Sequence, residues 1–119
     1  EVISKEPLGP MIRRGDWEFF TIVKWTLNGL LEAEELGVTK ANVDKMKAES
    51  KDPSVMRLVG TSGDVGKGFG LDNEWMVRAI KAVGNYGELY QRNIAPLGIP
   101  RGLNALWKDG GIMYAPPMR

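Results

Sequence analysis

The tryptophans and tyrosines of this chain are the side chains best suited to hold a small molecule. Four tryptophans and three tyrosines occur among its 119 residues. Such rings can enclose a cationic head group or stack on a flat ring. Trp25 and Trp75 fall on apolar helical stripes, so we expect them to pack in the core. If the chain alone binds a small molecule, Tyr86, Tyr90 and Trp107 are the residues that we predict to contact it.

A run of glycines forms a second candidate site, because glycine lets backbone amides approach a phosphate. The run consists of Gly60, Gly63, Gly66, Gly68 and Gly70. Lys67 adds a positive charge, but Thr61 occupies the first glycine position of a P-loop and Gly68 occupies the position of its Ser or Thr. The dinucleotide-binding glycine pattern is also missing. We therefore interpret residues 60–70 as a loop that connects two helices.

Two aspartates flank this glycine run and offer oxygen ligands for calcium. Asp64 and Asp72 lack the alternating acidic ligands of an EF-hand, and Trp75 stands where its final Glu belongs. We interpret one aspartate as a loop carboxylate and the other as a helix N-cap. The sequence predicts no metal site.

Acid–base catalysis has few possible residues here, because the chain contains neither cysteine nor histidine. Glu32, Glu34 and Glu35 gather near the end of a predicted helix. A carboxylate pair divides the roles of acid and base only in a shielded pocket, and we expect these three to form a solvated surface instead. We therefore predict that the chain is not an enzyme and that it has no cofactor.

Charge and hydropathy exclude two further classes of partner. Sixteen basic and fifteen acidic residues give a net charge of +1, without the clustered Lys and Arg that nucleic acid requires. The apolar stretches are a few residues each, too short to cross a bilayer.

The longest helical pattern runs from Trp17 to Leu36, with Asp16 as its N-cap and Gly37 at its end. Apolar residues at a spacing of three and four predict a stripe that organises the core. The stripe consists of Phe19, Ile22, Val23, Thr26, Leu27, Leu30 and Ala33.

Shorter helices are predicted over residues 40–48, 53–59, 74–83, 86–92 and 101–107, each bounded by capping residues, Gly or Pro. In this interpretation residues 1–15 form an extended arm and residues 16–37 include the long core helix. The predicted fold class is mainly α, a small single domain of five or six helices.

Five segments together resemble one protein family. They are EPLGPMIRRGD, IVKWTLNGLLEAEELGVTKANVD, GDVGKGFGLDNEW, VGNYGELYQRNIAPLG and RGLNALWKDGGIMYAPPMR. In this order they resemble the C-terminal region of the general L-amino-acid-binding periplasmic proteins of ABC importers.

The resemblance implies a type II periplasmic binding protein, in which two α/β lobes close on an amino acid and an ABC permease receives it. Residues 38–119 would then be a helical C-terminal extension. The family's ligand contacts, an Arg for the carboxylate and an acidic group for the amine, would lie outside this chain, so no residue inherits that role.

Two interpretations of function remain open from the sequence. The first is a portion or truncated relative of a periplasmic polar amino-acid receptor that lacks the amino-acid clamp. The second is a stand-alone helical domain that binds a different small molecule, or none, and assembles with itself through apolar stripes.

Overall fold

The computed structural model describes residues 9–118, and helices are the only regular elements of this part of the chain. The α-helices are α1 (Trp17–Glu35), α2 (Val43–Glu49), α3 (Pro53–Leu58), α4 (Val65–Gly68), α5 (Trp75–Val83) and α6 (Tyr86–Asn93). Three short 3-10 turns follow: η1 (Ala95–Leu97), η2 (Gly102–Asn104) and η3 (Trp107–Asp109). The predicted mainly α fold class is confirmed. The first eight residues of the predicted arm lie outside the described residues.

Local capping chemistry sets several of these helix ends. The side chain of Asp16 accepts a hydrogen bond from the Phe19 amide at 3.0 Å, at the start of α1. Asn85 and Glu88 form a reciprocal capping box at the start of α6, which the spacing of the two residues predicted. Such bonds satisfy the amides that a helix N-terminus leaves without a partner.

Two predicted segments are wrong in their local structure. Residues 60–70 are not loop throughout, because α4 forms one helical turn within the glycine run. Residues 101–107 do not form one helix but a 3-10 turn followed by an extended residue. Gly102 adopts a positive φ of 50°, and Ala105 is extended, so the helical hydrogen-bond pattern cannot continue.

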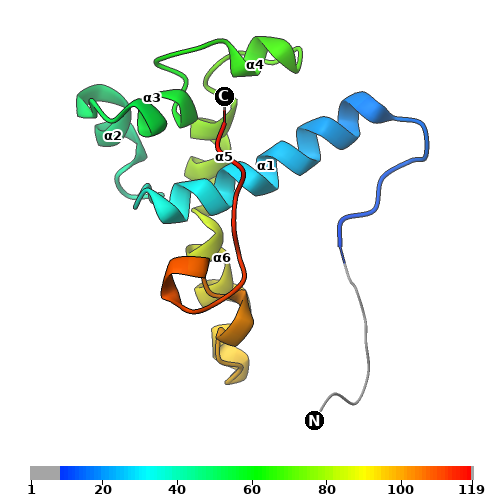
Figure 1. Ribbon diagram of the computed structural model, residues 1–119, viewed down its shortest axis with the longest axis vertical. Helices are drawn as coiled ribbons and strands as arrows, with labels where there is room; N and C mark the ends of the chain where they lie inside the picture. Colours follow the sequence, from blue (N-terminus) through cyan, green and yellow to red (C-terminus); the bar gives the residue numbers. More distant parts are fainter. Residues whose placement is uncertain (1–8, 119) are drawn as a thin grey trace.

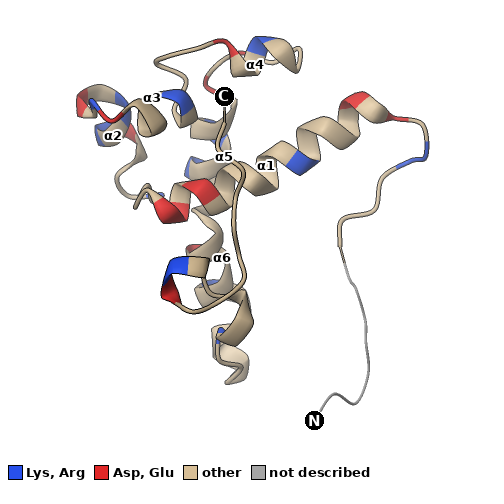
Figure 2. Cartoon of the chain, viewed as in Figure 1, with Lys and Arg blue, Asp and Glu red and all other residues tan. Residues whose placement is uncertain are grey.

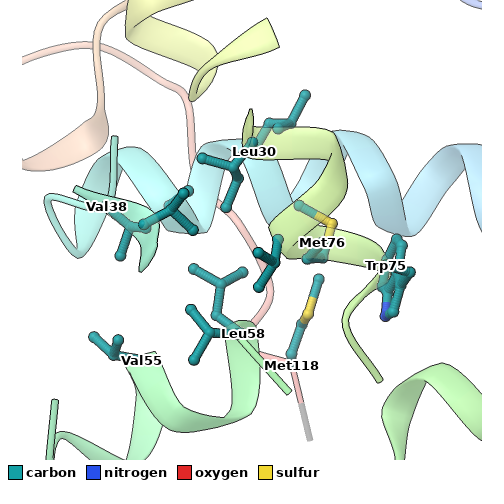
Figure 3. Packing of buried hydrophobic residues seen from close by; sticks show 12 residues of the cluster. Leu30, Val38, Val55, Leu58, Trp75, Met76 and Met118 are labelled. Carbon is teal, nitrogen blue, oxygen red and sulfur yellow. The ribbon is translucent and has the colours of Figure 1, made fainter. Parts of the chain in front are cut away.

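The core lies where α5 crosses the second half of α1 and where α3 packs beside them (Figure 1). Figure 3 shows Leu58, Met76 and Met118 meeting at its centre. Trp75 is 7% exposed and belongs to this core, as predicted. Trp25 packs against the core from its edge, stacked on Phe69 with ring centroids 6.4 Å apart.

The apolar stripe of α1 is buried over only part of its length, which corrects the prediction of a continuous core stripe. Within α1 the buried residues run from Gly29 to Ala33, and none precedes Gly29. Phe19 is 51% exposed and Leu27 is 37% exposed. The first half of α1 extends beyond α3 and α5 (Figure 1), and among the described residues only the end of α4 and the arm lie beside it, so it is covered in part.

The C-terminal tail runs across α1 and ends beside α3 and α5 (Figure 1). Its anchor is Met118, which is 2% exposed. The Met118 carbonyl accepts a hydrogen bond from Arg57 Nε at 3.1 Å, and its amide donates to Glu32 Oε2 at 3.3 Å. The tail is thus tied to α3 and to α1.

Candidate functional site

Two of the three predicted ligand-contact residues surround an internal cation. Tyr86 and Tyr90 lie one turn apart on α6, and the Cζ atom of Arg101 lies 5.5 Å and 5.7 Å from their ring centroids. Tyr90 is buried, and its hydroxyl donates toward the carbonyls of Ile99 and Pro100. Cation–π attraction of this kind holds a guanidinium in place. Any ligand at these two rings must lie beside Arg101 or displace it.

The guanidinium of Arg101 also forms a forked ion pair with Glu34. Its Nη2 atom lies 2.8 Å from Glu34 Oε2, and its Nη1 atom contacts Oε1. Hydrogen bonding to this carboxylate raises the pKa of Arg101 above its ordinary value. The pair joins α1 to the segment before η2, and both side chains are largely buried, so we interpret it as a structural link between distant parts of the chain.

Trp107, the third predicted residue, lies in a separate group. It is 56% exposed, and its indole Nε1 donates to the carboxylate of Glu35. Its ring meets Tyr114 edge to face at 6.4 Å. Within the described residues, no ring contact or hydrogen bond joins Trp107 to Tyr86 or Tyr90. The structure therefore brings two of the predicted residues together and leaves the third apart.

Figure 2 shows the acidic residues at the end of α1 in red. They are not a uniform solvated surface, which corrects that prediction. Glu32 is 6% exposed beneath the C-terminal tail, and Glu34 is engaged by Arg101. The tail and Arg101 come from residues far along the chain, so helical spacing alone cannot indicate the burial. No local sequence signal would have paired Glu34 with Arg101.

Burial raises the pKa of Glu32, while the Met118 amide and the charge of Arg57 oppose the shift. A carboxyl with a higher pKa in the folded chain than in the unfolded chain stabilises folding at low pH. That stabilisation is lost as the pH rises through the folded pKa.

We therefore expect wild type to gain stability relative to Glu32→Gln as the pH falls from 7 to 4. Each unit of pKa difference corresponds to about 1.4 kcal/mol. Urea unfolding of both proteins at several pH values measures the change, and Glu18→Gln, at an exposed position of α1, is the matched control. A Glu32→Gln difference that stays constant with pH would contradict the assignment.

The two aspartates that flank the glycine run form ion pairs with basic residues of the same chain. Lys67 Nζ lies 2.9 Å from Asp64, and Arg78 lies 2.7 Å from Asp72. The hydrogen bond from Lys67 lowers the pKa of Asp64, and that from Arg78 lowers the pKa of Asp72. Asp72 also accepts from the Glu74 amide, close to the predicted N-cap role. These pairs leave Lys67 directed to a neighbouring carboxylate.

A shallow polar hollow lies beside Arg101, between α1 and α6. Its lining residues are Glu34, Asn85, Gly87, Glu88, Gln91, Arg92 and Arg101. Gly87 faces the Glu34 carboxylate so closely that a Cβ there would lie 2.8 Å from its Oε1. The hollow mixes acidic and basic groups that are already paired with one another or with the backbone, such as Arg92 with the Val83 carbonyl. It is open to solvent, and its lining residues are polar, charged or glycine.

Comparison with known proteins gives similarity over the whole chain. It is 55% identical over 124 residues to the general L-amino acid-binding periplasmic protein AapJ of Rhizobium johnstonii, covering 100% of this chain and 36% of that protein. It is 52% identical over 122 residues to the glutamate/glutamine/aspartate/asparagine-binding protein BztA of Rhodobacter capsulatus, with the same coverage. No protein-family model matches the chain.

A solved structure agrees with these relatives in both sequence and shape. It is an ABC transporter periplasmic binding protein from Brucella ovis with glutathione bound, at 51% identity and a TM-score of 0.94. The match covers 100% of this chain and 38% of the Brucella ovis chain. The chain thus spans about a third of the length of the proteins that it matches.

Proposed function

Because the chain is homologous to the C-terminal region of amino-acid-binding proteins of ABC transporters, we propose that it serves as that portion of a polar amino-acid receptor. The observation that carries the proposal is the match over the full chain, at 51–55% identity and with the same three-dimensional arrangement. Its role is structural support of a receptor, and the amino acid binds mainly to the part that this chain does not match.

The geometry of the chain supports this division of roles. Tyr86 and Tyr90 face Arg101, and the two Nη atoms of Arg101 are bound to Glu34. The Nε atom of Arg101 has no hydrogen-bond partner, but it is buried and so does not face a ligand at the surface. A small-molecule site needs concave walls with polar groups left to orient the ligand. We keep Tyr86, Tyr90 and Trp107 as proposed contacts only for a ligand that binds the chain by itself.

The same homology supports proposals on the compartment, the partner and the chemistry of this chain. The relatives are named as periplasmic or amino-acid-binding proteins, which supports a periplasmic location and an ABC permease as the partner. None of the named relatives is an enzyme. We propose that the chain carries out transport-related binding and no catalysis.

The relatives' names also support a ligand class. The Rhodobacter capsulatus relative is named for binding glutamate, glutamine, aspartate and asparagine, and the Brucella ovis structure has glutathione bound. The γ-glutamyl group of glutathione carries the same α-amino and α-carboxylate groups as glutamate. We propose amino acids with a polar side chain as the substrate class of the receptor to which this chain belongs.

The isolated chain is expected to show no thermal shift with Glu, Gln, Asp or Asn, because it presents no second wall to enclose them. A bound ligand at 100 times its Kd would add about 2.7 kcal/mol of stability, an effect that thermal-shift measurements detect readily. A clear shift with any of the four would contradict this expectation.

A chimera tests the proposed function directly. In it, this chain replaces the matched 122 residues of the Rhodobacter capsulatus protein. We expect calorimetry to show that the chimera binds the four amino acids, with the unaltered Rhodobacter capsulatus protein as the control. A folded chimera that binds none of them would contradict the proposal.

A further inference from the structure

Large exposed apolar side chains occur at only two places in the described part of the chain. One group lies within residues 11–27 and the other within residues 97–114. The first group consists of Met11, Trp17, Phe19, Phe20 and Leu27. Residues 28–96 have none, so the middle of the chain covers its own apolar surface. Exposed apolar surface that is concentrated in this way marks an interaction site.

An apolar groove runs between the arm and the first half of α1. Pro10 and Ile12 line it from the arm, and Phe20, Val23 and Leu27 line it from the helix. These five residues are called the arm–helix face below. Lys24 stands at its rim. Figure 1 shows the arm leaving α1 at its start and turning back alongside it, at a distance from every other helix.

The relatives show that this projecting arrangement also occurs inside a larger protein. The Brucella ovis structure matches the whole of this chain with a TM-score of 0.94, and 62% of that protein's chain lies outside the match. An extended arm and half a helix have few contacts of their own to fix them. The high TM-score over the whole chain is reached within a protein about 2.6 times as long (100/38), whose further residues are available to pack on them.

We propose that the arm–helix face is the docking surface for the part of the receptor that this chain does not match. This proposal rests on the proposed function and adds where the two parts of the receptor contact each other. The partner is an apolar surface of the remaining receptor, which inserts between the arm and α1 and buries Phe20 and Leu27. The second exposed apolar group, within residues 97–114, is not part of this docking surface.

The test compares one double variant in two settings. Phe20→Gln with Leu27→Gln is made in the isolated chain and in the Rhodobacter capsulatus chimera, and Leu103→Gln, at a residue that is 66% exposed in the other group, is the matched control. Glutamine keeps helix propensity, so the comparison isolates the lost apolar contacts.

We expect the double variant to lower the Tm of the chimera at least about threefold more than that of the isolated chain. A given free-energy change moves the Tm of a larger protein less, so such a ratio can arise only from contacts made in the chimera. Leu103→Gln should leave both Tm values nearly unchanged. Equal shifts in the two settings, or a loss confined to Leu103→Gln, would overturn the proposal.

Two further outcomes bear on the choice of partner. If light scattering finds the isolated chain dimeric and the double variant monomeric, the face pairs two copies of this chain and the proposal is wrong. If the chimera does not fold, the arm–helix face does not fit the remaining part of the Rhodobacter capsulatus protein, and the proposal is wrong. Amino-acid binding by the chimera reports on the proposed function separately, since the Tm ratio holds whether or not a ligand binds.

Discussion

Gly60→Ala is expected to destabilise the protein by about 3–5 kcal/mol, enough to unfold much of it at 25 °C. A Cβ at this position would lie 1.9 Å from the backbone carbonyl oxygen of Asn73, which is far inside van der Waals contact. Gly60 also has a φ of 76°, which disfavours any side chain. Because the Cβ is bonded directly to the backbone and the carbonyl oxygen of Asn73 is itself a backbone atom, the clash cannot be relieved by turning a side chain. Urea unfolding followed by circular dichroism measures the loss.

Substitutions at two other glycines of the same run distinguish the cost of the backbone clash from the cost of the positive φ. Gly63 has a similar φ of 78°, but a Cβ there meets nothing within 4 Å, so Gly63→Ala should cost only about 1–2 kcal/mol. Gly68 has neither constraint, and Gly68→Ala should stay within about 1 kcal/mol of wild type. If Gly60→Ala costs no more than Gly63→Ala, the close approach of the backbone at Asn73 is absent in solution.

These glycines show how far the sequence could predict the connector between α3 and α5. The excess of glycine predicted a tight connection between the helices. This prediction agrees with the structure, because a positive φ or a close backbone contact at one position favours glycine at that position. The short helix α4 was missed. It depends on Gly66 fitting beneath the Asp72 carbonyl, where a Cβ would lie 2.2 Å from the oxygen, and no spacing rule reports such a contact.

The helix ends and the core were predictable to different degrees. Asp16, Asp52 and Asn85 cap helices through bonds to residues two or three positions away, so the sequence contains all the information needed. Burial along α1 is different, since it depends on what packs against the helix. The apolar period of α1 continues through its first half, which the described elements cover only in part, and the period therefore predicted more core than the structure has.

The candidate site was the least predictable feature. Tyr86, Tyr90 and Trp107 were identified from their aromatic type, and the first two do lie together. The group between them, Arg101, comes from a segment that the sequence indicated as helical and that folds as turns. The predicted resemblance to amino-acid-binding proteins is confirmed, because identity over a whole chain does not depend on resolving such contacts.

The buried side chain of Met118 anchors the C-terminal tail, and this leads to the second large effect. Met118 fills the space that Gly29 leaves open on α1: a Cβ at Gly29 would lie 2.6 Å from Met118 Cε and 2.7 Å from Met76 Sδ. Figure 3 shows the Met118 side chain directed at Met76 within the core. Because the helix has no side chain at this point, the two methionines supply the packing atoms from the other side.

Met118→Ala is expected to cost about 2–4 kcal/mol, the range for removing a buried methionine side chain and leaving a cavity. The loss should also loosen the end of the tail, since the hydrogen bonds to Glu32 and Arg57 use the Met118 backbone, which the buried side chain helps to hold in place. Urea unfolding gives the free energy, and faster hydrogen exchange of the amide of residue 118, which donates to Glu32 in wild type, would report the released tail. Met11→Ala removes the same atoms from a residue that is 97% exposed and should change stability by less than about 0.5 kcal/mol. Equal effects of the two substitutions would mean that the tail does not close the core.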